Sequence, residues 1–193
     1  MVVPRREEPE VTETVRAIDE REVLLLMLED QRRAVRNAVR GLGEEQARST
    51  PSASQLSLAA VIKHLTQGER MWTVVRMAER DVETDPQGEW MAGFQVGADE
   101  TVPVLLARWA EVARATEEIV RAEPDLDRVL ELSAETRRWL PSGVELTVRW
   151  ALLHLVEESA RHAGHADIIR ESIDGKSAWQ LEAEAQGIVG PGW

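Results

Sequence analysis

The sequence predicts an all-α protein, built as an up-down four-helix bundle with long crossover connections. Apolar residues recur at helical spacing in four long segments, and stretches containing glycine or proline separate these segments. No stretch shows a convincing strand pattern. The chain has 193 residues, of which 43% are hydrophobic and 30% charged. This length and composition are typical of one globular domain.

The first helix is expected between residues 17 and 40, after a polar, proline-containing lead-in over residues 1–16 that should be flexible. Gly41 then stops this helix, and a polar loop follows. Ser57 is suited to cap the start of a second helix over residues 58–80. The apolar positions that give the first helix its spacing are Val23, Leu24, Met27, Leu28, Val35 and Val39.

A long connection separates the second and third helices. Residues 81–100 are rich in glycine, aspartate and proline, which favours an irregular segment. Its aromatic residues, Trp90 and Phe94, are expected to pack back on the bundle. The third helix should open at about Thr101, with a proline tolerated in its first turn, and end before Pro124.

The fourth helix follows a second connection over residues 124–146. It is expected to run over about 147–174 and to be closed by Gly175. The bundle would therefore span residues 17–175. The tail over residues 176–193 begins with a short helical pattern and is expected to pack on the bundle.

Charge and composition exclude several classes of function. A formal net charge of −12 argues against a nucleic-acid groove, which needs clustered lysine and arginine, and against docking on an anionic membrane. No apolar run reaches the length of a membrane span or of a signal peptide, so a soluble cytoplasmic protein is expected. The chain has no cysteine. Any thiol chemistry must therefore use a thiol that arrives with a small molecule.

Ionisable residues form an inward stripe on the predicted fourth helix. In the segment HLVEESARHAGH, four such residues fall within an arc roughly 80° wide. They are His154, Glu158, His162 and His165. On the second helix, His64 lies on the same face as Leu65 and Trp72. Ionisable groups that face a core need partners, so the two helices are expected to meet at these residues.

Helical bundles build metal sites from inward residues on facing helices. Positions four apart rise about 6 Å along one face and can share an ion, whereas His154 and His162 lie about 12 Å apart. Spacing leaves open the pairs His154–Glu158, Glu158–His162 and His162–His165. It also leaves open a site without metal, in which His64 is a hydrogen-bonded core histidine and Glu158 forms an ion pair within its own helix.

Two segments resemble the DinB/YfiT-like metalloenzyme superfamily. GLGEEQARSTPSASQLSLAAVIKHLTQGERMW is similar to the first half of that fold, and LTVRWALLHLVEESARHAGHADIIRESIDG is similar to its last bundle helix. The match is nearest to an actinobacterial subgroup with GHAD and RE-x-x-DG signatures, and it covers roughly residues 17–175. The resemblance implies a four-helix bundle that is frequently a homodimer.

The family motif has one histidine on the second helix and two ligands four positions apart on the last helix. These positions match His64, Glu158 and His162, a set similar to that of the related mycothiol-dependent maleylpyruvate isomerases. The resemblance thus implies one divalent metal ion on these three residues, and no ligand role for His154 or His165. One hypothesis is that His154 orients the Glu158 carboxylate through a hydrogen bond, and that His165 does the same or packs at the edge of the site.

Two imidazoles and one carboxylate leave open positions on an ion, as catalysis requires. Zinc suits these ligands best, while nickel, iron and manganese also fit. The resemblance implies a transferase or isomerase in which a low-molecular-weight thiol such as mycothiol, as cosubstrate, attacks a small-molecule electrophile. The alternatives are a metal-dependent hydrolase that activates water and a non-catalytic, metal-stabilised dimeric bundle.

Three further residues border the predicted site. Arg161 is expected to be a surface residue that pairs with Glu157 or Glu158, although it would also suit an anionic substrate. Trp72 and Trp150 flank the site, either as core residues or as its wall.

Overall fold

The computed structural model describes residues 18–78, 92–138 and 142–188. Within these ranges the chain is helical and has no strand, apart from an isolated β-bridge between Val129 and Thr147. The predicted all-α fold is therefore confirmed. The main helices are α1 (Glu20–Val39), α3 (Leu58–Arg70), α5 (Val102–Ala122) and α7 (Val148–Asp174). The shorter elements are α2 (Glu44–Arg48), the π-helix η1 (Met71–Met77), α6 (Ala134–Arg137) and α8 (Ala178–Ala185).

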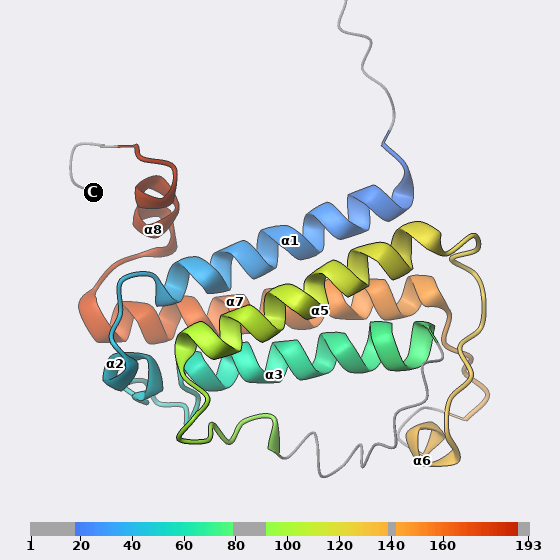
Figure 1. Cartoon of the computed structure of the whole chain (residues 1–193), viewed down its shortest axis with the longest axis horizontal. Coiled ribbons are helices and arrows are strands. Elements are labelled where there is room, and N and C mark those ends of the chain that lie inside the picture. Colours follow the sequence, from blue (N-terminus) through green and yellow to red (C-terminus); the bar gives the residue numbers. More distant parts are fainter. Residues whose placement is uncertain (1–17, 79–91, 139–141, 189–193) are drawn as a thin grey trace, which may run out of the picture.

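The four main helices pack as a bundle in which α1 and α7 run in one direction and α3 and α5 run in the other (Figure 1). Because α3 and α5 point the same way, the chain between them returns to the end of the bundle where α3 began. This is the long crossover that the sequence predicts. Helix α3 packs against both α5 and α7, and α1 packs against α7.

The ends of the main helices follow local sequence signals. The Ser57 side chain accepts a hydrogen bond from the backbone of Ala60 at the start of α3, and Thr147 does the same for Trp150 at the start of α7. Gly175 closes α7 with a φ of 80°, a left-handed conformation that favours glycine. The predicted second helix over residues 58–80 consists of α3 and, directly after it, the π-helix η1, which ends at Met77; residues 79 and 80 lie outside the described residues.

The buried face of α1 agrees with the apolar pattern at most positions. Val23 and Met27 are exposed, but the other four apolar positions that the spacing identifies are buried: Leu24, Leu28, Val35 and Val39. The buried face also includes Leu25 and Arg32. A buried arginine is outside what an apolar pattern can indicate.

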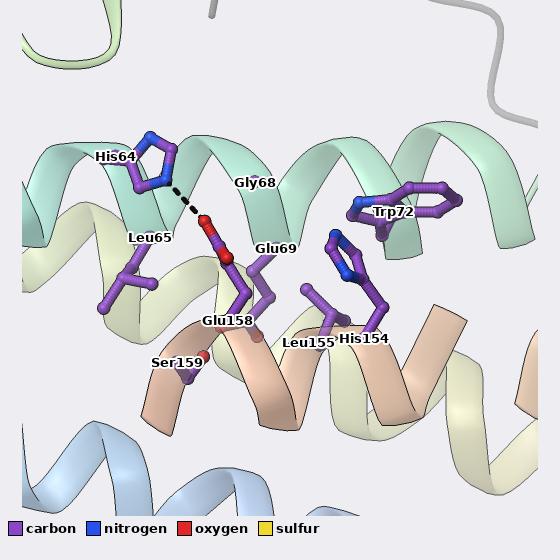
Figure 2. Close-up of a pocket in the computed structure, with 9 residues that line it drawn as sticks. All are labelled: His64, Leu65, Gly68, Glu69, Trp72, His154, Leu155, Glu158 and Ser159. Carbon is purple, nitrogen blue, oxygen red and sulfur yellow. Dashed lines mark hydrogen bonds and ion pairs between the residues drawn. The ribbon is translucent and has the colours of Figure 1, made fainter. Parts of the chain in front are cut away.

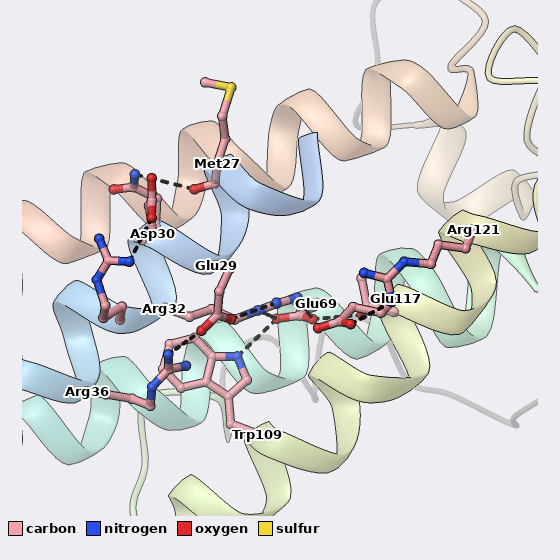
Figure 3. A network of polar contacts seen from close by, with 12 residues as sticks. Met27, Glu29, Asp30, Arg32, Arg36, Glu69, Trp109, Glu117 and Arg121 are labelled. Atoms are coloured by element: carbon pink, nitrogen blue, oxygen red, sulfur yellow. Dashed lines mark hydrogen bonds and ion pairs between the residues drawn. The ribbon is translucent and has the colours of Figure 1, made fainter. Parts of the chain in front are cut away.

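Arg32 is buried because it pairs with a buried glutamate on a neighbouring helix (Figure 3). The side chain of Arg32 is 1% exposed and that of Glu69 is 3% exposed. Arg32 donates two hydrogen bonds to Glu69, of 3.1 Å from Nε and 2.5 Å from Nη2. Trp109 Nε1 and Thr116 Oγ1 donate to the same carboxylate at 3.0 and 2.7 Å. One carboxylate thereby ties α1, α3 and α5 together.

The RE-x-x-DG segment has a structural role at the other end of the bundle. Arg170 on α7 is buried and donates to the backbone oxygens of Ala38 and Arg40, at 2.9 and 2.8 Å, where α1 ends. Asp174 holds the same guanidinium through two hydrogen bonds of 3.0 and 2.8 Å. The arginine thus satisfies carbonyl groups that the helix end leaves unpaired.

The tail contributes α8, which packs against α1. Asn37 Nδ2 donates to Glu182 Oε2 at 2.8 Å across this contact. The predicted lead-in over residues 1–16, Trp90 and the last residues of the tail, 189–193, lie outside the described residues. Among the helices that the structure describes, none is long and apolar enough to cross a membrane.

The buried ion pair gives a test of the fold. We expect Arg32→Met to lower the free energy of unfolding by about 3–5 kcal/mol, because it leaves the Glu69 carboxylate buried without its counter-charge. The double variant Arg32→Met, Glu69→Met should recover a large part of this loss. Urea unfolding measures both. The control is Arg33→Met on the exposed side of α1, which should change stability by less than about 0.5 kcal/mol. A single variant as stable as wild type would contradict the role of the pair.

Candidate metal centre

Three ionisable side chains from two helices converge between α3 and α7. Glu158 Oε1 lies 3.2 Å from His64 Nε2 and 3.2 Å from His162 Nε2. One ligand atom from each of the three residues lies within 4.8 Å of the others. His64 is 8% exposed and His162 is 6% exposed, while Glu158 is half-buried. The structure therefore brings together the three residues that the family resemblance indicates.

The charge of this group is that of an ionised carboxylate between two imidazoles. Hydrogen bonds from His162 and then from His64 hold the pKa of Glu158 well below its ordinary value. Arg161 Nη1 donates to the other oxygen, Oε2, at 3.3 Å, and Arg161 Nη2 donates to Glu157 at 2.7 Å. Arg161 is exposed and pairs with both glutamates, as the sequence predicts.

The arrangement fits a divalent metal ion. Bonds of about 2.0–2.1 Å to a tetrahedral zinc place neighbouring ligand atoms about 3.3 Å apart. The two separations of 3.2 Å that Glu158 Oε1 makes with His64 and His162 match this spacing. Two imidazole nitrogens and one carboxylate oxygen are also donors that zinc and several other divalent metals accept.

The remaining histidines lie on either side of these three residues. His165 Nδ1 is 3.4 Å from His162 Nδ1, on the ring atom that faces away from Glu158. His154 Nδ1 is 3.7 Å from Glu157 Oε2. The ion-pair partner of His154 among the described residues is thus Glu157, and not Glu158 as hypothesised. Of these two histidines, His165 is the one placed to orient a candidate ligand, because it faces the ring of His162.

A phenylalanine covers the second-helix histidine. The rings of His64 and Phe94 are stacked, with centroids 4.1 Å apart and an interplanar angle of 17°. Lys63 anchors the segment that carries Phe94, since its Nζ donates to the Gln95 backbone and to Glu100 Oε2, both at 2.7 Å. The expectation that Phe94 packs back on the bundle is confirmed.

A cavity of about 110 Å³ opens beside the group, between α3 and α7 (Figure 2). Liquid water occupies about 30 Å³ per molecule, so the cavity has room for a few waters or a small chemical group. Gly68 borders this open space, since a Cβ at this position would meet nothing within 4 Å. The lining residues are His64, Leu65, Gly68, Glu69, Trp72, His154, Leu155, Glu158 and Ser159.

Aromatic rings close one end of the cavity. The Trp72 ring centroid lies 5.4 Å from that of His154, in an edge-on arrangement, and 5.3 Å from that of Trp150. His154 stacks on Trp150, with centroids 5.0 Å apart. Trp150 is 37% exposed. Trp72 and His154 therefore form the wall at this end of the cavity, and Trp150 packs against both of them without lining it.

Glu69 is the lining residue that sequence reasoning missed. It lies four positions after Leu65 and five after His64 on α3, so its spacing already places it near the inward face. A glutamate at such a position indicates a buried partner. The sequence alone cannot show that this partner is Arg32, which lies 37 residues earlier.

The bundle, together with two histidines and a glutamate that converge beside a cavity, defines a DinB-like protein with a candidate metal centre. Comparison with known proteins agrees with this class. The family model described as mycothiol-S-transferase matches residues 23–175. The chain belongs to this family.

Other comparisons bear on the fold. The crystal structure of a conserved protein from Enterococcus faecalis is similar, with a TM-score of 0.64 and 14% sequence identity. The alignment covers 83% of this chain and 100% of that one. At this identity the likeness concerns the fold alone. A search of curated protein sequences found no match.

Replacement of Gly68 tests whether the space beside this residue is open. We expect Gly68→Ala to raise the free energy of unfolding by about 0.5–1 kcal/mol, because alanine restricts the unfolded chain and suits a helix interior better than glycine. Gly164→Ala on α7 is the matched control, since its Cβ also meets nothing within 4 Å and Gly164 does not line the cavity. Urea unfolding compares the two. If only Gly68→Ala destabilises the protein, the space beside Gly68 is not open.

Proposed function

We propose that the protein is a metal-dependent thiol S-transferase. In this proposal His64, Glu158 and His162 hold one divalent ion, and a low-molecular-weight thiol such as mycothiol is the cosubstrate. The observation that carries the proposal is the convergence of three ligand atoms within 4.8 Å beside a cavity. Membership of the mycothiol-S-transferase family supports the choice of thiol.

Zinc is the ion that we propose first, with nickel, iron or manganese as substitutes that suit the same donors. Three protein ligands are one fewer than a closed tetrahedral site has, so a position would remain for a substrate. The cavity lies on the side of His64 and Glu158 where a small group has access. These features favour a catalytic site over a purely structural one.

The thiol must come from a small molecule because the chain has no cysteine. An ion bound by these residues would favour the thiolate form of such a thiol at neutral pH. The thiolate, and not the thiol, is the effective nucleophile. The cavity volume of about 110 Å³ suits the sulfur-bearing end of a cosubstrate, with the rest of that molecule lying outside.

The surrounding residues would hold the ligands in place and exclude water. Phe94 covers one face of the His64 ring, which limits the access of solvent to that ligand. His165 faces His162 Nδ1, where a hydrogen bond can fix the orientation of the ring. Arg161 pairs with Glu158 Oε2 and leaves Oε1 directed toward the two histidines.

Metal binding is the first test. Wild-type protein is expected to bind one zinc ion per chain, and His64→Ala, Glu158→Ala and His162→Ala should each lose it. His165→Ala should weaken zinc binding by about 10–100-fold, the usual effect of removing a residue that orients a ligand. His154→Ala, which also removes a histidine from α7, is the control and should keep wild-type affinity. Metal analysis and competition with a chelator measure these affinities. Equal zinc contents in wild type and His64→Ala would contradict the proposed ligand set.

Thiol transfer is the second test. Zinc-loaded protein is incubated with mycothiol and, in turn, an alkyl halide, a nitroaryl halide and an α,β-unsaturated acid. We expect thiol consumption together with formation of the conjugate, because the bound thiol is activated as thiolate. His64→Ala protein should show only the uncatalysed rate. Metal-loaded protein that consumes no thiol with any of these electrophiles would contradict the transferase, and conversion that needs no thiol would favour a hydrolase instead.

A further inference from the structure

One histidine lines the cavity without belonging to the candidate metal centre. His154 on α7 lies four residues before Glu158, which is about 6 Å along the helix axis. Both side chains extend from α7 toward α3 and line the same cavity (Figure 2). Because the cavity has a volume of only about 110 Å³, a chemical group inside it lies near His154 as well as near Glu158.

The ring of His154 is held in one orientation by aromatic contacts. It stacks on Trp150 with an interplanar angle of 17°, and it meets Trp72 edge-on with an interplanar angle of 73°. Arg76, the charged residue of η1, lies over the Trp72 ring and does not line the cavity. A side chain that exchanges a proton with a ligand needs such a fixed position.

The two ring nitrogens of His154 have different surroundings. Nδ1 faces Glu157 Oε2 at 3.7 Å. The other oxygen of this carboxylate, Oε1, accepts a hydrogen bond of 2.7 Å from Arg161. Nε2 has no hydrogen-bond partner within the part of the chain that the structure describes. A carboxylate beside Nδ1 favours a proton on that atom and stabilises the charged form of the ring, so Nε2 is the atom that can accept a proton.

The other ionisable residues that line the cavity are already engaged. Glu158 Oε1 lies 3.2 Å from His64 Nε2, and both residues belong to the candidate ligand set. Glu69 pairs with Arg32 at 2.5 Å. No described residue of α1 lines the cavity. His154 is therefore the ionisable lining residue that remains to exchange a proton with a ligand.

We propose that His154 is the general base of thiol transfer, and that its Nε2 accepts the proton of the cosubstrate thiol inside the cavity. The proposal rests on the proposed function, because the sulfur-bearing end of the cosubstrate would occupy this cavity. A nucleophile, a base within its reach and a third group that orients the base form a recurring catalytic arrangement. Here the cosubstrate supplies the nucleophile, His154 is the base and Glu157 is the orienting carboxylate.

The proposed step moves one proton and one electron pair. The S–H bond breaks, its proton bonds to Nε2 of His154, and the sulfur keeps the electron pair. With a halide substrate, the sulfur then forms a bond to carbon while the halide ion leaves with its bonding electrons. The imidazolium finally returns its proton to water. Glu157 stabilises the imidazolium while it exists.

The first test counts protons when the thiol binds. Zinc-loaded protein is titrated with mycothiol at about pH 7.5, where an ordinary imidazole is neutral and an ordinary thiol is protonated. Ultraviolet absorbance reports thiolate, and calorimetry in buffers of different ionisation enthalpy reports protons released. Wild type should form thiolate and release almost no proton, because His154 keeps it. His154→Gln and His154→Phe should form less thiolate, or release about one proton for each thiolate.

Three results of this titration overturn the proposal. They are a wild type that forms no thiolate, a wild type that releases a proton for each thiolate, and variants that match wild type in both measurements. His154→Phe keeps an aromatic ring against Trp150, so agreement between the two variants separates loss of the base from loss of packing.

The second test is the pH dependence of transfer to the nitroaryl halide. His154→Gln should lower kcat/KM about 100-fold at neutral pH. This defect should shrink toward about pH 9, because a free thiol ionises by itself near its ordinary pKa of about 8.5. Glu157→Gln should cause a smaller loss. The control Glu171→Gln removes the same charge from an exposed position of α7 and should keep the wild-type rate. A defect of the same size at every pH overturns the proposal.

These measurements separate this proposal from the proposed function. Zinc content is measured on the same samples, and His154→Gln should retain the wild-type content. Wild type that binds no mycothiol contradicts the proposed function and the general base together. Wild type that transfers the thiol, with His154→Gln equally fast at neutral pH, overturns the general base alone.

Discussion

The buried Glu69 carboxylate is the constraint on which the arrangement of α3 depends. A carboxylate in a protein interior needs an opposite charge and hydrogen bonds to both oxygens, and here Arg32, Trp109 and Thr116 provide them from α1 and α5. Glu69 lies on α3 between His64 and the start of η1, which carries Trp72, and it lines the same cavity. Any rotation of α3 that moved His64 away from α7 would also break the bonds to Glu69. A buried ion pair adds little net stability, but it fixes one orientation of the helix.

The change of pitch after Arg70 extends the same constraint. Thr73 Oγ1 donates to the Glu69 backbone oxygen at 2.9 Å and lies 3.0 Å from Thr116 Oγ1, which itself donates to the Glu69 carboxylate. The wider turn of η1 thus begins where α3 is most firmly held. Segments of π-helix are often found at functional sites, and this one carries Trp72 at the end of the cavity. The bundle and the cavity wall are therefore specified by the same few polar contacts.

The sequence predicts what is local and misses what depends on distant partners. The starts of α3 and α7 and the end of α7 follow from Ser57, Thr147 and Gly175, because each acts within one turn of its own helix. Helical spacing places His64 and Glu158 on inward faces, but it leaves three ligand pairs open, and only the family resemblance selects Glu158 with His162. The Arg32–Glu69 pair has no local signal, since burial of either residue makes sense only when the other is known. The same dependence explains why the apolar pattern of α1 does not identify Arg32 as part of its buried face.

The two imidazoles of the candidate centre face the same carboxylate oxygen but are oriented in different ways. Both Nε2 atoms lie 3.2 Å from Glu158 Oε1, so an ion held between the three side chains would meet one ligand atom from each. His162 is oriented by a second histidine, because His165 Nδ1 lies 3.4 Å from His162 Nδ1. His64 is oriented instead by an aromatic contact, since its ring stacks on Phe94 with centroids 4.1 Å apart. One ligand position of the candidate centre therefore depends on α7 alone, whereas the other depends on the segment that Lys63 anchors to α3.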